Sequence, residues 1–193
     1  MNNLCFSHIA FLVPSVDKSA IYLNSLNIQS NPPEILKSEG TKEIYFGSYK
    51  KNSGLLLLVE AITEGPYQRA LTKRGPSLHH IGLIVQDLKK FVIKAQQAGW
   101  KLHPVSQQSI EHSETAWFFL EGVPTLIEVY ENNEISTQPV QVTKVELPIK
   151  TSQIQLFEEI GLGGIVSSIA DGIHITVDGK RLSFEQIACL NKF

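Results

Sequence analysis

Two histidines occupy matching points of the sequence and could bind a metal ion together. His8 opens the segment 8–13 and His80 opens the segment 80–85, so the two lie 72 residues apart. Each is followed by an apolar stretch that is typical of a strand. If the two segments are equivalent parts of a repeat, a pseudo-twofold axis relates them, and the imidazoles can face each other across a cleft. Imidazole is a common ligand of divalent metals in catalytic sites.

The offset of 72 persists beyond the histidines. Ser15 falls opposite Asp87, and both residues are good N-caps for the amphipathic helical patterns that follow them. Tyr45 falls opposite Trp117, in segments whose aromatic content favours strands. Each half then contains one more apolar strand, at residues 55–60 and 125–130. The sequence therefore predicts a strand, a helix and about three strands in each half.

A βαβββ unit of this size is too small to bury its own sheet, so two such units should pair. We expect an α+β fold in which two paired βαβββ modules form curved sheets around a metal-binding cleft, with a C-terminal α/β extension. The expected boundaries are a first module at 1–62, a linker at 63–78, a second module at 79–134 and the extension at 135–193.

Within the extension, the pattern predicts three strands and two helices, with strands at 142–149, 165–169 and 173–177 and helices at 151–160 and 183–190. The extension could be a partial third module, a cover for a sheet edge or a dimer contact. The sequence does not choose among these.

Glu128 is the third candidate ligand. It lies in an apolar strand, where an unpaired carboxylate is costly to bury and a metal would relieve that cost. Two imidazoles and a carboxylate with open coordination positions suit zinc, iron, manganese, cobalt or nickel. The alternative for each histidine is a hydrogen-bonded core or surface residue. The other histidines have no partner in the repeat and are predicted not to be ligands: His79, His103, His112 and His174.

Composition excludes several functional classes. The chain has 17 Lys and Arg against 19 Asp and Glu, with no basic stripe, so nucleic acid is not an expected partner. Its longest apolar run, residues 55–59, is too short to cross a membrane. Cys5 and Cys189 lack metal-ligand spacing, and residues 1–11 lack a signal-peptide pattern. We therefore expect a cytoplasmic, reduced protein.

Three segments carry a resemblance to a known family. Residues 8–13, 78–88 and 126–131 read HIAFLV, LHHIGLIVQDL and LIEVYE. They resemble the glyoxalase and methylmalonyl-CoA epimerase branch of the vicinal-oxygen-chelate superfamily, over about residues 4–134. The resemblance implies one divalent metal held by His8, His80 and Glu128. It does not fix the reaction, because this fold supports several chemistries.

The family usually takes a fourth ligand, glutamate or glutamine, from the last strand of the first half. Here the repeat puts Leu56 or Leu57 opposite Glu128, whereas Glu60 matches Glu131 beyond the ligand position. Either Glu60 reaches the metal through a shifted register, or the site has three protein ligands.

Glu43 is the second candidate for catalysis. Residues 38–46 resemble the epimerase segment that supplies a base, and Glu43 takes the matching position. Glu43 and Glu128 would then remove and return a proton next to a carbonyl that the metal polarises. The alternative is a solvent-facing strand residue beside Lys42.

Three functions remain in competition. The first is a divalent-metal-dependent lyase or isomerase that acts by proton transfer next to a carbonyl or thioester, similar to glyoxalase or methylmalonyl-CoA epimerase. The second is a non-haem iron dioxygenase of the extradiol type, because two histidines and one glutamate also suit that site. The third is a non-catalytic small-molecule binding protein of the resistance type.

The expected partner is a small-molecule substrate, with an acyl-CoA as the candidate that the resemblance implies. Basic residues in predicted loops could contact CoA, namely Lys50, Lys51, Lys73 and Arg74. An exposed sheet edge would also allow a homodimer.

Overall fold

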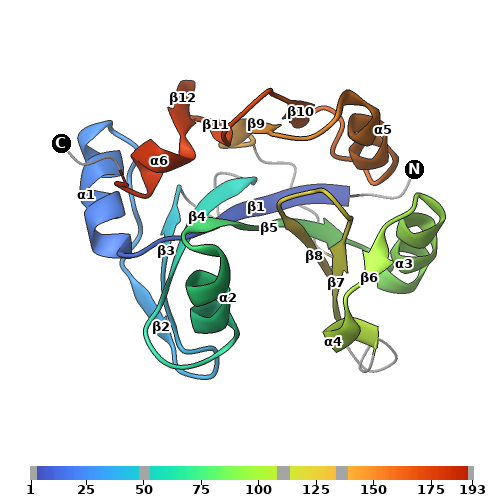
Figure 1. The fold of residues 1–193 in the computed structure, drawn as a ribbon, viewed down its shortest axis with the longest axis horizontal. Coiled ribbons are helices and arrows are strands. Elements are labelled where there is room, and N and C mark those ends of the chain that lie inside the picture. Colours follow the sequence, from blue (N-terminus) through green and yellow to red (C-terminus); the bar gives the residue numbers. More distant parts are fainter. Residues whose placement is uncertain (1–3, 48–52, 108–113, 134–138, 191–193) are drawn as a thin grey trace.

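The computed structural model of the protein describes residues 4–47, 53–107, 114–133 and 139–190 (Figure 1). The first half contains β1 (Leu4–Leu12), α1 (Val16–Ser25), β2 (Glu34–Leu36), β3 (Thr41–Phe46) and β4 (Leu55–Ala61). The second half repeats this order as β5 (Ser77–Val85), α3 (Leu88–Gln97), β6 (Lys101–Leu102), β7 (Thr115–Phe119) and β8 (Leu126–Glu131), with a short helix α4 (Pro104–Gln107) after β6. The predicted α+β fold of two βαβββ units is confirmed.

The two halves share one curved eight-stranded sheet, in the order β2-β3-β4-β1-β5-β8-β7-β6. β1 and β5 pair antiparallel at its centre, and in each half the first strand runs parallel to the last. His8 lies opposite Gly82 in the central pair, and His80 lies opposite Ala10. The two histidines therefore sit on adjacent strands at the middle of the sheet. β2 and β6 form the sheet edges.

The C-terminal extension covers the convex side of this sheet (Figure 1). It consists of β9 (Val142–Leu147), α5 (Thr151–Glu159), β10 (Val166–Ser168), β11 (His174–Val177), β12 (Lys180–Ser183) and α6 (Phe184–Ile187), with a four-stranded sheet in the order β10-β9-β11-β12. Phe184 stacks on Phe11 of β1 at 5.3 Å between ring centroids, and Phe157 packs against Trp100 at 5.2 Å. The extension repeats the sequence of a strand, a helix and three strands. Its first strand, β9, lies between two others, unlike β1 and β5 within their own halves, so its sheet has a different strand order.

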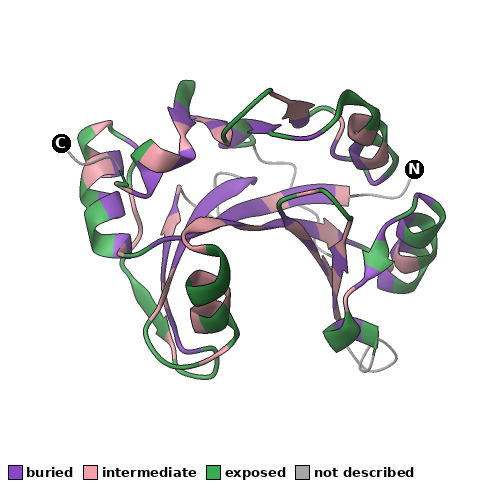
Figure 2. Ribbon diagram, viewed as in Figure 1, coloured by how far each residue is buried: buried purple, intermediate pink, exposed green. Residues whose placement is uncertain are grey.

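The apolar run in β4 is buried on both faces (Figure 2). Leu56 and Leu58 join the main core on the convex side. Leu57 and Val59 pack on the concave side against residues of α2 (Pro66–Arg74). A strand covered on both faces has no need to alternate, which explains the continuous apolar pattern. The helix α2 lies within residues 63–78, the segment predicted as a linker, and its presence was not predicted.

No helix in the described ranges is long and apolar enough to span a membrane. The longest helices, α1 and α3, have 10 residues each. Ser15 and Asp87 cap them as predicted, because their side chains accept hydrogen bonds from the backbone amides of Lys18 and Lys90.

A second capping contact ties the last strand of each half to its helix. Glu60 Oε2 accepts a hydrogen bond from the amide of Val16 at 2.9 Å, and Glu131 Oε2 accepts one from the amide of Leu88 at 2.8 Å. Each carboxylate stands at a helix N-terminus, where the free amides and the helix dipole favour a negative charge. Glu60 is therefore held at α1, away from the histidines.

The Glu60 contact predicts a loss of stability on substitution. Glu60→Ala should lower the free energy of unfolding by about 1 kcal/mol, because the amide of Val16 loses its acceptor. Glu60→Gln keeps an acceptor oxygen and should lose less. Denaturant unfolding measures both variants, and metal affinity should stay unchanged. Weaker metal binding with unchanged stability would contradict this assignment.

Candidate metal centre

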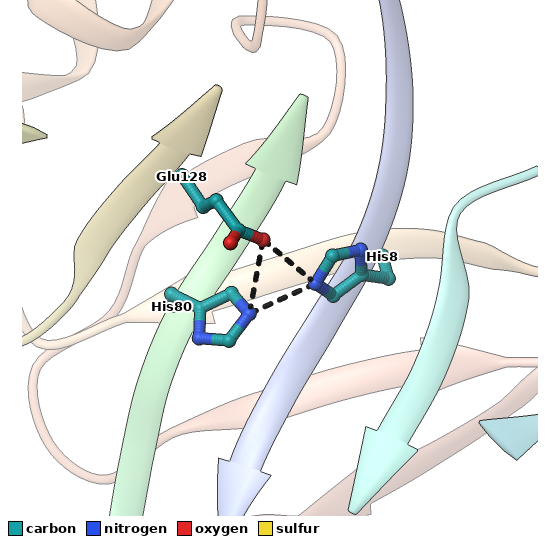
Figure 3. A group of neighbouring side chains, drawn as sticks. All are labelled: His8, His80 and Glu128. Carbon is teal, nitrogen blue, oxygen red and sulfur yellow. Dashed lines mark hydrogen bonds and ion pairs between the residues drawn. The ribbon is translucent and has the colours of Figure 1, made fainter. Parts of the chain in front are cut away.

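The three candidate ligands lie together on three adjacent strands (Figure 3). His8 Nε2 and His80 Nε2 are 2.8 Å apart, and each lies 3.5 Å from Glu128 Oε2. Within the described part of the chain, this is the one group of three or more His, Cys, Asp or Glu side chains placed to hold a metal ion. The structure thus brings together the residues that the sequence predicts.

Strand register accounts for this geometry. Gly82 of β5 pairs with His8 on one side and with Glu128 on the other. A Cβ added to Gly82 would stand 2.6 Å from His8 Nδ1 and 2.9 Å from His8 Nε2. The missing side chain therefore leaves the space in which the His8 ring turns toward His80 and Glu128.

The three donor atoms fit a divalent metal. The circle through a triangle of sides 2.8, 3.5 and 3.5 Å has a radius of about 1.9 Å, close to the ~2.0–2.1 Å of a zinc–imidazole bond. His8, His80 and Glu128 would therefore hold a single divalent ion at separations that suit their donor atoms. Three protein donors also leave coordination positions open, as in catalytic rather than structural sites.

Both histidine rings are oriented through their other nitrogen. His8 Nδ1 lies 3.0 Å from Ser7 Oγ, which lies 2.6 Å from Tyr130 Oη. His80 Nδ1 lies 2.9 Å from His79 Nδ1. A proton on each Nδ1 can be accepted by these partners, which leaves each Nε2 lone pair directed into the site. His79 thus orients the His80 ring. It is not one of the predicted ligands.

Two aromatic side chains flank the pair symmetrically. The Tyr45 ring meets the His8 ring edge-on at 6.1 Å, and the Trp117 ring meets the His80 ring edge-on at 5.0 Å. Tyr45 and Trp117 occupy equivalent positions of the repeat, so the same pseudo-twofold axis that relates the two histidines also relates these two walls of the site. Their apolar bulk helps to keep water from the imidazoles.

Burial sets the charges of the ligands. It lowers the pKa of His8 to about 4, and it lowers the pKa of His80 well below its usual value, with the neighbouring histidines adding to the effect. Both rings are therefore neutral near pH 7. Burial, followed by the charges of Glu39 and Glu43, raises the pKa of Glu128 to about 7. A cation between the three donors would relieve the cost of the partly buried carboxylate, whose side chain is 20% exposed.

Glu128 faces a cavity of about 600 Å³. The cavity lies between the sheet and α2, and its lining includes Thr115, Trp117, Leu126, Pro66, Tyr67, Ala70, Arg74, His79 and His103, with Glu39 from the β2–β3 turn. Tyr67 forms a hydrogen bond with Glu39, and its ring packs at a tilt against His79 with 4.8 Å between centroids. Glu39 and Tyr67 were not predicted. Pro66 at the helix start and Gly75 just after its end are the signals that could have revealed α2.

The structure places Glu43 on β3, where it is 7% exposed. Thr41 Oγ1 donates a 2.8 Å hydrogen bond to Glu43 Oε1. Burial raises the pKa of Glu43, the bond from Thr41 opposes that rise, and the charges of Glu39 and Glu34 add to it. Glu43 is therefore a buried residue, unlike the solvent-facing alternative.

Leu57 takes the position that corresponds to Glu128. Leu57 pairs with Ala10 in the first half as Glu128 pairs with Gly82 in the second. It is buried beneath α2, among Tyr67 and its neighbours. Since Glu60 is held at α1, the first half offers an apolar side chain where the family usually has a fourth ligand.

The remaining candidates lie elsewhere. His174 is on β11 in the extension, and Cys5 and Cys189 are not joined in a disulfide. Lys73 and Arg74 form the last turn of α2. Lys50, Lys51 and His112 fall outside the described residues.

Comparison with known proteins identifies the family and the fold. Residues 7–119 match the family described as Glyoxalase/Bleomycin resistance protein/Dioxygenase superfamily. No curated protein matches the sequence. Among solved structures, a hypothetical protein from Bacillus halodurans C-125 is 21% identical, with a TM-score of 0.52 over 70% of this chain and 99% of its own. Methylmalonyl-CoA epimerase from Mycobacterium tuberculosis is 18% identical, with a TM-score of 0.51 over 67% and 89%.

A variant of the Streptomyces coelicolor methylmalonyl-CoA epimerase, solved in complex with 2-nitronate-propionyl-CoA, is 14% identical. Its TM-score is 0.50 over 69% of this chain and 97% of its own. At these identities the structures establish a shared fold.

Metal affinity should depend on pH through Glu128. Because its pKa lies at about 7, a proton must leave the carboxylate before metal binds at lower pH. The zinc affinity should fall by about tenfold per unit as the pH drops from 7 to 5, whereas the neutral histidines add little in that range. Calorimetry in buffers of different ionisation enthalpy measures the released proton. Glu128→Gln should bind more weakly and without this slope, and a flat wild-type profile would contradict the assignment.

Gly82→Ala tests the space beside His8. The added methyl group should displace the ring and weaken metal binding by about tenfold or more, because overpacking costs about 1–3 kcal/mol. Gly164→Ala is a matched control, since a Cβ there meets nothing within 4 Å. Zinc titration and circular dichroism check affinity and fold. Equal affinity of the two variants would show that the missing Cβ is not needed.

Proposed function

The chain belongs to the Glyoxalase/Bleomycin resistance protein/Dioxygenase superfamily, and from this premise we propose that it is a divalent-metal-dependent lyase or isomerase. It would move a proton on the carbon next to a carbonyl or thioester of a small molecule. The observation that carries the proposal is the convergence of His8 and His80 with Glu128, which lines a cavity of about 600 Å³.

His8, His80 and Glu128 would hold the metal, which would be zinc, cobalt, nickel, manganese or iron. When bound there, it would polarise a carbonyl oxygen and acidify the adjacent C–H group. The chain supplies the preconditions for this chemistry. Its imidazoles are neutral at pH 7, and the hydrogen bonds at Nδ1 fix their orientation.

Glu128 and Glu43 are the proposed proton carriers. Burial raises the pKa of both carboxyl groups, which brings each closer to the working pH than an exposed glutamate. Glu43 lies on the same face of β3 as Tyr45, whose ring meets His8. Its charge also raises the pKa of Glu128, so the two carboxylates interact electrostatically.

The helix α2 completes the proposed site. Its side chains Tyr67 and Ala70 form the cavity wall opposite the sheet, and they limit the entry of water to the ligands. Exclusion of water strengthens electrostatic interactions within a site. Tyr67 holds Glu39 by a hydrogen bond, and burial keeps the Tyr67 hydroxyl protonated by raising its pKa.

An acyl-CoA is the first substrate class to test. The sequence motifs resemble the epimerase branch, and methylmalonyl-CoA epimerases share the fold. A cavity of about 600 Å³ can hold an acyl group of modest size.

One observation favours a second candidate. Leu57 at the fourth position leaves two histidines and one carboxylate, the donor set of non-haem iron oxygenases. The same leucine would also suit a non-catalytic binding protein. Oxygen uptake with a catechol and ferrous iron identifies the former, and ligand affinity that survives metal removal identifies the latter.

Substitutions should separate metal binding from proton transfer. In D₂O, the metal-loaded protein should exchange the α-proton of methylmalonyl-CoA, which proton NMR follows. His80→Ala should lose both metal and exchange. Glu43→Gln should keep the metal, but its exchange rate should fall by about 10²–10⁴-fold, the usual contribution of a general base. Glu159→Gln, at the exposed end of α5 in the extension, is the matched control and should retain the rate.

Two outcomes would reject the proposal. The first is the absence of metal in protein purified without chelators. The second is α-proton exchange that persists in His80→Ala.

A further inference from the structure

Two cavities adjoin on the concave side of the molecule. The inner cavity, of about 600 Å³, contains Glu128, and an outer cavity of about 630 Å³ lies beside it. Three residues line both of them, namely Arg74, His103 and Leu126. These residues therefore stand at the junction through which a ligand in one cavity would extend into the other.

The two cavities differ in charge. Glu39 and Glu128 line the inner cavity, whereas the outer cavity is lined by apolar and neutral polar residues together with Arg74. Arg74 is exposed at the end of α2. Among the described residues, no carboxylate lies within ion-pair distance of its guanidinium. Arg74 is thus a cation available to a ligand, and the neighbouring Lys73 lines neither cavity.

His103 supplies a second donor at the junction. Its Nδ1 accepts a hydrogen bond from the amide of Val105 at 3.4 Å, so the proton of the neutral ring lies on Nε2. The backbone of His103 is fixed, because its amide donates to the carbonyl of Trp117 at 2.7 Å. Nε2–H is therefore a positioned donor, and the ring contacts Phe119 edge-on.

We propose that Arg74 and His103 form an anion-binding subsite for the end of the substrate remote from the metal. The ligand would carry a carboxylate or a phosphate, since a guanidinium and an N–H donor suit oxyanions of either kind. Glu39 repels an anion from the inner cavity, so the charged end would be directed to the junction and the reacting carbonyl to Glu128. The inference deepens the proposed function and rests on it only for the position of the reacting carbonyl.

Binding of simple anions tests the subsite. Isotope-labelled full-length protein, both zinc-loaded and chelator-treated, is titrated with inorganic phosphate and, separately, with acetate, while NMR follows the Arg74 Nε–H and His103 signals. At least one anion should give saturable shifts in both forms. Arg74→Met should weaken that binding by about tenfold or more, the effect of losing a charged hydrogen bond. Lys73→Met is the matched control and should change it less than about twofold.

His103→Asn tests the second donor. The asparagine side chain can still accept a hydrogen bond from the Val105 amide, but it has no donor at the Nε2 position. The substitution should therefore weaken anion binding by about threefold to tenfold. Saturation by phosphate alone would identify a phosphate-bearing ligand, and saturation by acetate alone would identify a carboxylate.

The inference is overturned if neither anion saturates, or if Lys73→Met is as weak as Arg74→Met. It is also overturned if chelation abolishes binding, because the anion then sits on the metal. Failure of the proposed function would instead appear as missing metal or missing proton exchange, with anion binding intact.

Discussion

The antiparallel pairing of β1 with β5 is the constraint on which the rest of the structure depends. It sets two equivalent strands side by side and brings His8 Nε2 and His80 Nε2 to 2.8 Å in a buried position. Burial lowers the pKa of both imidazoles, and the neighbouring histidines lower the pKa of His80 further, so neither ring is charged near pH 7. The pairing therefore determines both the geometry of the donors and their protonation. The extension on the convex face and α2 on the concave face keep this central pair covered.

The helix α2 breaks the symmetry that the sheet creates. It fills the concave side of the first half, where its residues pack on Leu57 and Val59. The second half keeps its concave face open, so Glu128 reaches a cavity while its counterpart does not. At this one position the first repeat thus supplies Leu57, which packs against the helix, and the second supplies Glu128, which lines the cavity. The same helix contributes Tyr67 to the inner cavity wall and Arg74 to the junction.

The features that could be predicted from the sequence are those that the internal repeat makes visible. His8 and His80 could be paired because an offset of 72 holds from the first strand through the N-caps Ser15 and Asp87. The second half has one residue fewer than the first before its last strand. Glu60 and Glu131, which cap equivalent helices, are therefore 71 residues apart instead of 72. That slip, together with the parity of strand residues, left the position opposite Glu128 undecided between Leu56 and Leu57.

Other features depend on contacts between distant parts of the chain, which the periodicity of the sequence does not reveal. The cavity forms because α2 lies over a sheet whose far strands come about fifty residues later in the chain. Local sequence patterns do not reveal contacts between such distant segments. The hairpin of β11 and β12 was missed although Asp178 and Gly179, both with positive φ, provide a turn signal.

Glu128 could be found from the sequence because a carboxylate is unusual in an apolar strand. Leu57, at the equivalent position of the first half, shows the residue type that packing alone would favour there. Leu57 proves that this fold accepts an apolar side chain at the equivalent position, where it is buried at no electrostatic cost. A carboxylate with a pKa raised to about 7 is the less stable choice for packing alone, so its presence beside two neutral imidazoles is best explained by a cation.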